Sequence, residues 1–188
     1  MKKTIGIILE VVFLILCIVV AYFLSNYMFA TVPIDGNSME GLLHNEDKVI
    51  VYKVGNYKHG DVVIFDTGET YINDAGKETN RYFVKRIIGL PGDTIEIKAS
   101  PDGEYYVYRN GEKLIEDYLT ADVKNAYGAM EATVIKDGEF FFLGDNRLNS
   151  DDSRNDRRGK LDNIVGRVIL RYGREGFFKD NDVIKRVA

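Results

Sequence analysis

The feature that most constrains this chain is an apolar segment near its N-terminus. The first residues read MKKTIGIILEVVFLILCIVVAYFLSNY, and Glu10 is the one charge between Ile5 and Leu24. About 20 residues of this kind cross the hydrocarbon core of a bilayer as a helix. A charge near one end of that helix can reach the headgroup region, where it costs less than at the bilayer centre. The segment therefore predicts one membrane-spanning helix.

The charges on either side of the segment predict its orientation. Lys2 and Lys3 precede it, whereas the first charges after it are Asp35 and Glu40. Lysine and arginine collect on the cytoplasmic side of membrane helices. We therefore expect a single-pass protein of the cell membrane, with a cytoplasmic N-terminus and an extracytoplasmic domain.

A cleavable signal peptide is the alternative interpretation of the same segment. Such a peptide ends at a cleavage site with two small residues at alternate positions. Ahead of Thr31, Ala30 is small, but the residue two positions earlier is Met28. We therefore favour an uncleaved anchor in residues 1–26, followed by an extracytoplasmic domain in residues 27–188.

Beyond the anchor, the apolar pattern changes to short runs rich in β-branched and aromatic residues. No long segment there repeats its apolar residues at helical spacing. Asn110-Gly111 and Asp137-Gly138 are dipeptides typical of hairpin turns. We predict a mainly β fold, a folded-over antiparallel sheet or barrel-like catalytic domain, with residues 99–137 as a peripheral excursion. The expected strands lie in residues 48–54, 61–67, 81–88, 94–98, 104–115, 133–145 and 166–172.

Composition excludes several classes of function. The chain has 188 residues, enough for one globular domain, and a formal net charge of −4. It has no long basic block of the kind that neutralises phosphates. Cys17 is the only cysteine and lies in the apolar segment, and the two histidines show no ligand spacing. We therefore expect no nucleic-acid partner, no cofactor and no metal ion.

The stretch IDGNSMEGLLH places Ser38 between a flexible Gly-Asn pair and an apolar run. A serine nucleophile needs a base within hydrogen-bonding reach. The only histidines, His44 and His59, stand in polar surroundings typical of surface residues. If Ser38 is a nucleophile, we expect its base elsewhere; otherwise it is an ordinary hydroxyl in a turn.

Lysine can serve as a base when it is neutral, and burial among apolar groups lowers its pKa. In a strand covering RYFVKRII, the period of two places Lys85 on one face with Phe83 and Ile87. Val84 and Arg86 lie on the other face. The alternative is that Lys85 reaches solvent from a strand edge while Arg86 faces water.

A polar segment near the C-terminal end offers a second set of candidates. FFLGDNRLNSDDSRNDRRGK, residues 141–160, passes from phenylalanines to polar residues of alternating charge. Mixed runs of this kind are usually solvated loops. Serine, aspartate and arginine at short spacing can also hold a catalytic lysine in place, with salt bridges that fix the loop. Spacing alone leaves both interpretations open.

These segments share their order with one known family. The matching pieces are Ser38-Met39, GDVVIF at 60–65, VKRIIGLPGD at 84–93, GDNRLNSDDSR at 144–154 and Gly166-Arg167. Together they resemble the type I signal peptidases, in their short, single-anchor Gram-positive form. The resemblance runs from the anchor to about Tyr172, and the combination of SM, KRIIGLPGD and GDNRxxSxDSR is very specific.

The resemblance implies a membrane-bound serine endopeptidase that removes signal peptides from secreted preproteins, cutting after small residues at positions −1 and −3. The implied partners are preprotein signal peptides, the lipid bilayer and nearby protein-export machinery. It makes Ser38 the nucleophile, Lys85 the general base and Ser150 the hydroxyl that orients the lysine. The residues that match members shaping the site through ionic contacts are Asp145, Asp152 and Arg154.

The resemblance also implies that the Ser38 backbone N–H forms part of an oxyanion hole. Gly36 stands where Gram-negative relatives place a serine whose hydroxyl contributes to the oxyanion hole. The resemblance therefore does not identify the second hydrogen-bond donor of the hole in this chain. We include Gly36 and Asn37 among the supporting residues. The chain reads SMEGLL where the family usually reads SMxPTL, and Gly41 replaces a proline. We expect this to tune the site rather than destroy it. 

Three apolar residues after the serine, Met39, Leu42 and Leu43, are expected to dip into the membrane interface.

Two other functions are alternatives to the peptidase. A self-cleaving repressor-type protease would need a soluble DNA-binding module where this chain has its apolar segment. A non-catalytic, membrane-tethered β domain of the same fold, acting as an assembly or chaperone factor, would be expected to lose the serine or the lysine, and both are present.

Overall fold

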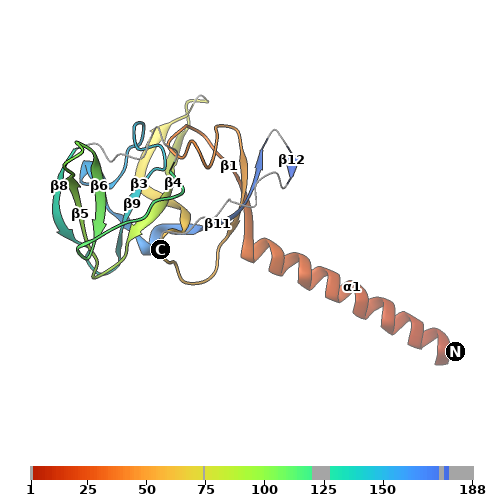
Figure 1. Cartoon of the computed structure of the whole chain (residues 1–188). Helices are drawn as coiled ribbons and strands as arrows, with labels where there is room; N and C mark the ends of the chain where they lie inside the picture. The colour runs from red at the N-terminus through yellow and green to blue at the C-terminus, as the bar shows by residue number, and fades with distance from the viewer. Residues whose placement is uncertain (1, 74, 120–127, 174–175, 178–188) are drawn as a thin grey trace.

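Figure 1 presents the computed structural model, which describes residues 2–73, 75–119, 128–173 and 176–177. One long helix, α1, extends away from a domain built of strands. The elements are α1 (Lys2–Met28), β1 (Phe29–Pro33), β2 (Lys48–Tyr52), β3 (Val62–Ile72), β4 (Glu78–Gly89), β5 (Thr94–Ala99), β6 (Tyr105–Arg109), β7 (Glu112–Lys113), β8 (Met130–Val134), β9 (Glu139–Leu143), β10 (Gly159–Lys160), β11 (Ile164–Gly173) and β12 (Gly176–Phe177), with short 3₁₀ helices η2 (Ser153–Asn155) and η3 (Leu161–Asn163).

The predicted apolar helix is present. Its stretch Thr4–Met28 is long and apolar enough to cross a membrane, and none of its most apolar part is buried inside the protein. The last turn is held against the domain by Lys53, whose Nζ donates to the Asn26 carbonyl at 2.7 Å and whose N–H donates to the Met28 carbonyl at 2.8 Å. Lys53 thus satisfies carbonyls that a helix end leaves without partners.

The strands form two antiparallel sheets. The larger follows the order β1-β2-β11-β3-β4-β9-β10, with β12 paired to β11, and the smaller follows β7-β6-β5-β8. Figure 1 places the small sheet at the end of the domain away from α1. The predicted mainly β, antiparallel fold behind one apolar helix is confirmed. Strands β6, β7 and β8 of the small sheet come from the range 99–137, of which residues 120–127 lie outside the described residues.

Three apolar clusters hold these sheets together. One joins Ile88 and Phe141 of the large sheet to Ile95 and Val107 of the small sheet. A second packs side chains of β2, β3 and β11 against the chain after β1. The third is aromatic: Phe142 in β9 lies 4.8 Å from Phe65 and 5.7 Å from Phe140, measured between ring centroids. Because β4 contributes to all three clusters, its position is fixed from both faces.

The two turn dipeptides have different outcomes. Asn110 and Gly111 have φ of 55° and 85° and connect β6 to β7, which confirms that hairpin. Asp137-Gly138 also forms a turn, with Gly138 at φ 76°, but β8 and β9 belong to different sheets. The hairpin predicted there is wrong. The dipeptide sets the local turn, whereas the apolar faces of β8 and β9 determine which strands they pair with.

Phe142→Ala tests the aromatic cluster that supports β9. The side chain is 1% exposed, so its removal should lower the free energy of unfolding by about 3–5 kcal/mol. Ile115→Ala is the control, because Ile115 is 65% exposed and should change stability by less than about 0.5 kcal/mol. Urea unfolding followed by circular dichroism measures both. A loss below about 1 kcal/mol for Phe142→Ala would contradict this packing.

Candidate active site

Ser38 and Lys85 meet in the structure although 47 residues separate them in the chain. Lys85 lies in β4, where it pairs with Val63 of β3, and Ser38 lies in the turn that follows β1. Their side chains are hydrogen-bonded, with 2.6 Å between Lys85 Nζ and Ser38 Oγ. This is the contact that a serine nucleophile and a lysine base require.

Lys85 is buried in surroundings that disfavour its charge. The residue is 3% exposed, and its Nζ lies 4.8 Å from the centroid of the Phe83 ring on the same strand face. Burial is the largest influence and lowers the pKa of Lys85 from 10.5 to about 8, although the negative charges of Asp152, Asp151 and Asp145 act in the opposite direction. A substantial fraction of Lys85 is therefore neutral at mildly alkaline pH.

The turn that carries Ser38 is fixed by backbone hydrogen bonds. The Glu40 N–H donates to the Asn37 carbonyl at 3.1 Å, and the Leu43 N–H donates to the Met39 carbonyl at 2.8 Å. Gly41 has φ 103°, which glycine adopts readily and proline, held near −65°, cannot adopt. A proline could therefore not replace Gly41 without a change in the path of this turn.

The prediction that Met39 and Leu43 face the membrane is wrong. They are 1% and 0% exposed and belong to the cluster formed with Val49, Val51 and neighbouring side chains. Leu42 is partly buried and packs against the same cluster. The backbone turn directs these side chains inward, and a short apolar run does not by itself distinguish a core segment from a membrane-contacting one.

The segment after β9 packs directly against Ser38. A Cβ added to Gly144 would overlap the Ser38 carbonyl oxygen and Ser150 Oγ, so this contact admits only glycine. The Asn146 N–H donates to the same Ser38 carbonyl at 3.0 Å. The Asp145 N–H lies 3.4 Å from the sulfur of Met39. The backbone position of the serine is therefore set by residues 144–146.

Asp152 and Arg154 form an ion pair that supports this segment. Arg154 donates from Nε to Asp152 Oδ1 at 2.8 Å and from Nη2 to Oδ2 at 2.9 Å, while the Gly144 N–H donates to Oδ2 at 3.1 Å. Burial alone would raise the pKa of Asp152, but the hydrogen bonds and charge of Arg154 outweigh it and hold the pKa below its usual value. The carboxylate stays ionised and keeps its hold on Gly144.

Asp145 pairs with Arg86, the neighbour of Lys85 in β4. Arg86 donates from Nε at 2.8 Å and from Nη2 at 2.5 Å to the two carboxylate oxygens, and from Nη1 to the Gly60 carbonyl at 2.9 Å. Arg86 is fully buried, so the alternative that placed it in water is wrong. The face of β4 opposite Lys85 is also covered, because the small sheet and its connections pack there.

Ser150 reaches the site without the contact expected of it. Its Oγ is buried against Gly144 and makes no hydrogen bond to Lys85 among the described residues; it lies beside Asp152 instead, where its hydroxyl helps to lower the pKa of that carboxyl. Gly36 donates its N–H to Asn45 Oδ1 at 2.9 Å, and the Asn37 carbonyl accepts from Asn146 Nδ2 at 3.0 Å. The Gly36 N–H is therefore engaged and not directed at a substrate.

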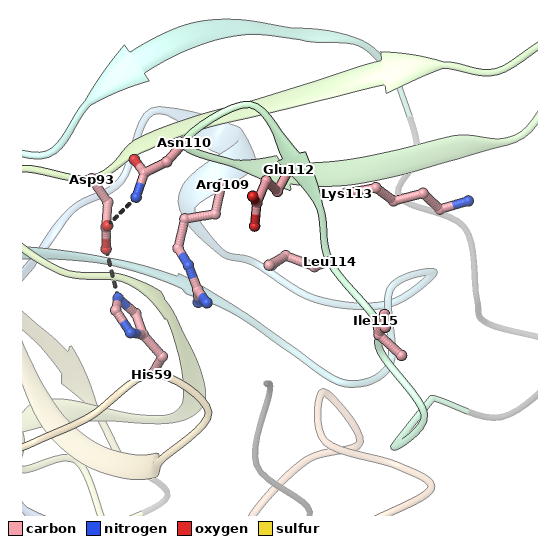
Figure 2. Close-up of a pocket in the computed structure, with 8 residues that line it drawn as sticks. All are labelled: His59, Asp93, Arg109, Asn110, Glu112, Lys113, Leu114 and Ile115. Carbon is pink, nitrogen blue, oxygen red and sulfur yellow. Dashed lines mark hydrogen bonds and ion pairs between the residues drawn. The ribbon is translucent and has the colours of Figure 1, made fainter.

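Both histidines make contacts elsewhere. His44 is exposed and lies 3.7 Å from Asp47. His59 lines a cavity of about 500 Å³ (Figure 2). Its Nε2 lies 2.6 Å from Asp93 Oδ2, and Asn110 Nδ2 donates to the other carboxylate oxygen of Asp93 at 2.8 Å. These contacts tie the chain before β3 to the start of the small sheet.

Within the described part of the chain, no group of three or more histidine, cysteine or acidic residues is placed to hold a metal ion.

The sequence of the whole domain decides the family. Residues 7–173 match the family model described as signal peptidase, peptidase S26. The chain belongs to this family. Signal peptidase I of Bacillus licheniformis is 37% identical over 153 residues, which cover 76% of this chain and 75% of that protein. Signal peptidase I S of Bacillus subtilis (strain 168) is 34% identical over 157 residues, with 76% and 75% covered.

Among solved structures, a signal peptidase I from Enterococcus faecalis V583 is 26% identical, with a TM-score of 0.48, and covers 62% of this chain and 99% of its own. The assignment to peptidase S26 rests on the sequence matches and makes this chain an enzyme that hydrolyses peptide bonds. It thereby favours the enzyme over the non-catalytic alternative. The apolar helix, in a chain of this family, indicates a membrane-anchored protein.

Sequence reasoning missed two residues that hold the site, Arg147 and Glu116. Arg147 is fully buried in the segment after β9, where Nε donates to the Gly144 carbonyl at 3.1 Å and Nη1 donates to Glu116 at 3.1 Å. The sequence offered a weak signal for Arg147, which stands inside the quoted GDNR. It offered none for Glu116, an acidic residue in the range 99–137 that the sequence predicts as a peripheral excursion.

The burial of Lys85 predicts a stability cost that depends on pH. Below pH 8 the native state holds a buried ammonium, and a pKa lowered from 10.5 to about 8 corresponds to about 3 kcal/mol of lost stability. Between about pH 8 and 10.5 the unfolded lysine binds a proton that the native one does not, so native stability rises with pH. Lys85→Met removes this dependence and should be more stable than the parent at pH 7.

Urea unfolding of the detergent-solubilised chain at pH 7 and pH 10 checks this expectation. The advantage of Lys85→Met should approach about 3 kcal/mol at pH 7 and shrink at pH 10. An advantage that is absent at pH 7, or that grows with pH, would contradict a buried, easily deprotonated lysine.

Proposed function

We propose that this chain is a membrane-bound serine endopeptidase that removes signal peptides from secreted preproteins, with Ser38 as nucleophile and Lys85 as general base. The observation that carries the proposal is the 2.6 Å contact between Lys85 Nζ and Ser38 Oγ, made by a lysine whose pKa is lowered to about 8. A neutral amine in that position can accept the hydroxyl proton as the serine attacks.

The reaction proceeds by acyl transfer in two stages. Neutral Lys85 takes the proton of Ser38 while Oγ bonds to the scissile carbonyl carbon, and the resulting ammonium returns the proton to the leaving amine. This yields an acyl-enzyme ester on Ser38. Lys85, neutral again, then takes a proton from the water that attacks the ester. When the bond between the carbonyl carbon and Oγ breaks, the ammonium returns this proton to Ser38 Oγ, which regenerates the serine and releases the new C-terminus of the signal peptide.

The oxyanion of each tetrahedral intermediate needs hydrogen-bond donors. We assign one to the Ser38 backbone N–H, and a donor of this kind is typically worth about 3–4 kcal/mol of transition-state stabilisation. The Gly36 N–H is a poor candidate for the second donor, because it already donates to Asn45. We assign the second donor to the side-chain amide of Asn37, which is exposed and directly precedes the serine in the chain.

The substrate class follows from the relatives and from the position of the site. Both relatives named above are signal peptidases I, and we propose that this chain likewise cuts after small residues at −1 and −3. Phe83 is partly exposed and lies on the same face of β4 as Lys85, where it offers an apolar surface beside the dyad for an extended peptide. Shallow apolar pockets there would admit alanine and exclude larger side chains.

We further propose that α1 crosses the bilayer with its N-terminus in the cytoplasm. Lys2 and Lys3 precede the apolar stretch, which favours that orientation. The helix continues into β1 at Phe29, so the β domain starts directly at the membrane surface. The domain then lies against lipid and beside the export machinery, where signal peptides emerge.

Ser38→Ala and Lys85→Ala should each lower the rate of preprotein cleavage by at least about 10³-fold, since each removes one member of the reacting pair. Lys136→Ala, at an exposed lysine, is the control and should cleave like the parent. The assay incubates each detergent-solubilised protein with a preprotein and sequences the new N-terminus. Substantial cleavage by either dyad variant at the parental bond would reject the proposed mechanism.

The pH dependence of cleavage tests the protonation state of the base. Because Lys85 acts when neutral, kcat/KM should rise with pH through about 8 and level off above it. Asp151→Asn should move this rise to lower pH, because the Asp151 charge favours the ammonium form of Lys85. Glu69→Gln is the matched control: it removes the other carboxylate that contacts Arg157 and should leave the midpoint in place. A rise seen only above about pH 10 would contradict a buried base.

A further inference from the structure

The segment after β9 that positions Ser38 is itself held by residues from outside the matched motifs. Arg147 in that segment is fully buried, and its guanidinium makes two hydrogen bonds to Glu116: Nη1 to Oε2 at 3.1 Å and Nη2 to Oε1 at 2.5 Å. Nη2 also donates to the Tyr118 hydroxyl at 3.1 Å. Glu116 and Tyr118 belong to the connection that follows β7 of the small sheet.

Tyr118 links this contact to the arginine beside the proposed base. The guanidinium carbon of Arg86 lies 3.9 Å from the centroid of the Tyr118 ring, and the Tyr118 hydroxyl donates to Glu116 Oε1 at 2.5 Å. Burial, with the charge of Glu116, raises the pKa of Tyr118 well above 10, so the hydroxyl keeps its proton for that bond. Tyr118 thus contacts both buried arginines, Arg86 through its ring and Arg147 through its hydroxyl.

Charge balance makes Glu116 necessary for this arrangement. The two buried cations, Arg86 and Arg147, face two carboxylates, Asp145 and Glu116. Asp145 already gives both oxygens to Arg86. Without the charge of Glu116, Arg147 is left as a buried cation with only neutral acceptors, which costs more free energy than the intact pair. Arg147 then has to move, and the backbone that it holds moves with it.

That backbone is the one in contact with the nucleophile. Arg147 Nε donates to the Gly144 carbonyl, and Gly144 packs against the Ser38 carbonyl without room for a methyl group. The N–H of Asn146, the residue before Arg147, donates to the same Ser38 carbonyl. A shift of residues 144–147 therefore changes the position of Ser38 relative to Lys85, and a displacement near 1 Å can reduce a rate by about 10²-fold.

We propose that Glu116 is a positioning residue for the Ser38–Lys85 pair, acting through Arg147 with Tyr118 as its support. The inference rests on the proposed function of that pair. It assigns to the connection after β7 a role in catalysis that none of the matched motifs contains.

Glu116→Gln is the test variant, because it keeps the shape of the side chain and removes its charge. Asp117→Asn is the matched control: it makes the same change at the next, exposed residue. With a preprotein substrate, Glu116→Gln should lower kcat by at least about tenfold and leave KM within about twofold. The midpoint of the rise of kcat/KM with pH should move upward, because a loosened segment lets water reach Lys85 and weakens the burial that lowers its pKa. Asp117→Asn should match the parent in all three.

The pH midpoint separates positioning from a general loss of structure. A fall in activity that only follows the fraction of folded protein, measured by near-UV circular dichroism, with an unchanged midpoint, would overturn the proposal. Parental kcat and midpoint in Glu116→Gln would also overturn it. If Glu116→Gln does not fold, Tyr118→Phe decides: it keeps the ring on Arg86 but removes the hydroxyl, and should lower kcat by at least about threefold with the same upward shift. Parental kinetics in that variant would then overturn the proposal.

The two proposals fail in different ways. If Ser38→Ala retains cleavage, the dyad itself is wrong, whatever Glu116 does. If Ser38→Ala is inactive and Glu116→Gln cleaves like the parent, only the positioning role is wrong.

Discussion

The proposed catalytic activity depends on the burial of one amine, Lys85, in contact with one hydroxyl, Ser38. A lysine in water is protonated at neutral pH and cannot accept a proton, so its use as a base requires an environment that destabilises the ammonium form. The Phe83 ring and the covered strand β4 provide that environment. Three carboxylates nearby limit the effect, and the pKa therefore settles near 8 instead of falling further.

An amine held opposite the serine needs rigid surroundings. Most of the buried charged side chains among the described residues lie around the site and provide this rigidity. Asp152 accepts a hydrogen bond from the backbone N–H of Gly144. Asp145 accepts one from Arg86, the neighbour of Lys85 in β4. Each carboxylate faces an arginine, so the site is stabilised by paired charges and not by isolated ones. The apolar clusters on both faces of β4 exclude water from these pairs and strengthen them.

The sequence predicted the parts of this site that depend on local pattern. Strand periodicity placed Lys85 on the face of Phe83, and the order of the matched motifs brought Ser38 and residues 144–154 into one hypothesis. The sequence did not predict that Arg86 is buried, because alternation assigns a residue to a face and does not reveal that both faces are covered. Glu116 could not be predicted for a different reason. Its partner Arg147 lies 31 residues away, and a charge pair over that distance leaves no pattern in the local sequence.

The apolar run after Ser38 illustrates a related limit. Met39 and Leu43 have the composition of a membrane-contacting patch, yet the turn directs them into the core. Gly41 contributes to this outcome, since its positive φ sets the path of the chain there. The apolar character of such residues favours their burial. Only the backbone path determines whether they are buried in the protein core or in a membrane.

The central claim is that Lys85 is deprotonated far more easily than an ordinary lysine. It is tested most directly by ¹³C NMR of the detergent-solubilised chain labelled at the lysine ε-carbon, with Lys85→Arg to assign the signal. We predict one signal, absent from the variant, that titrates near pH 8, below the value of about 10.4 that is usual for a lysine in water. A Lys85 signal that titrates only near that usual value would contradict this account of the site.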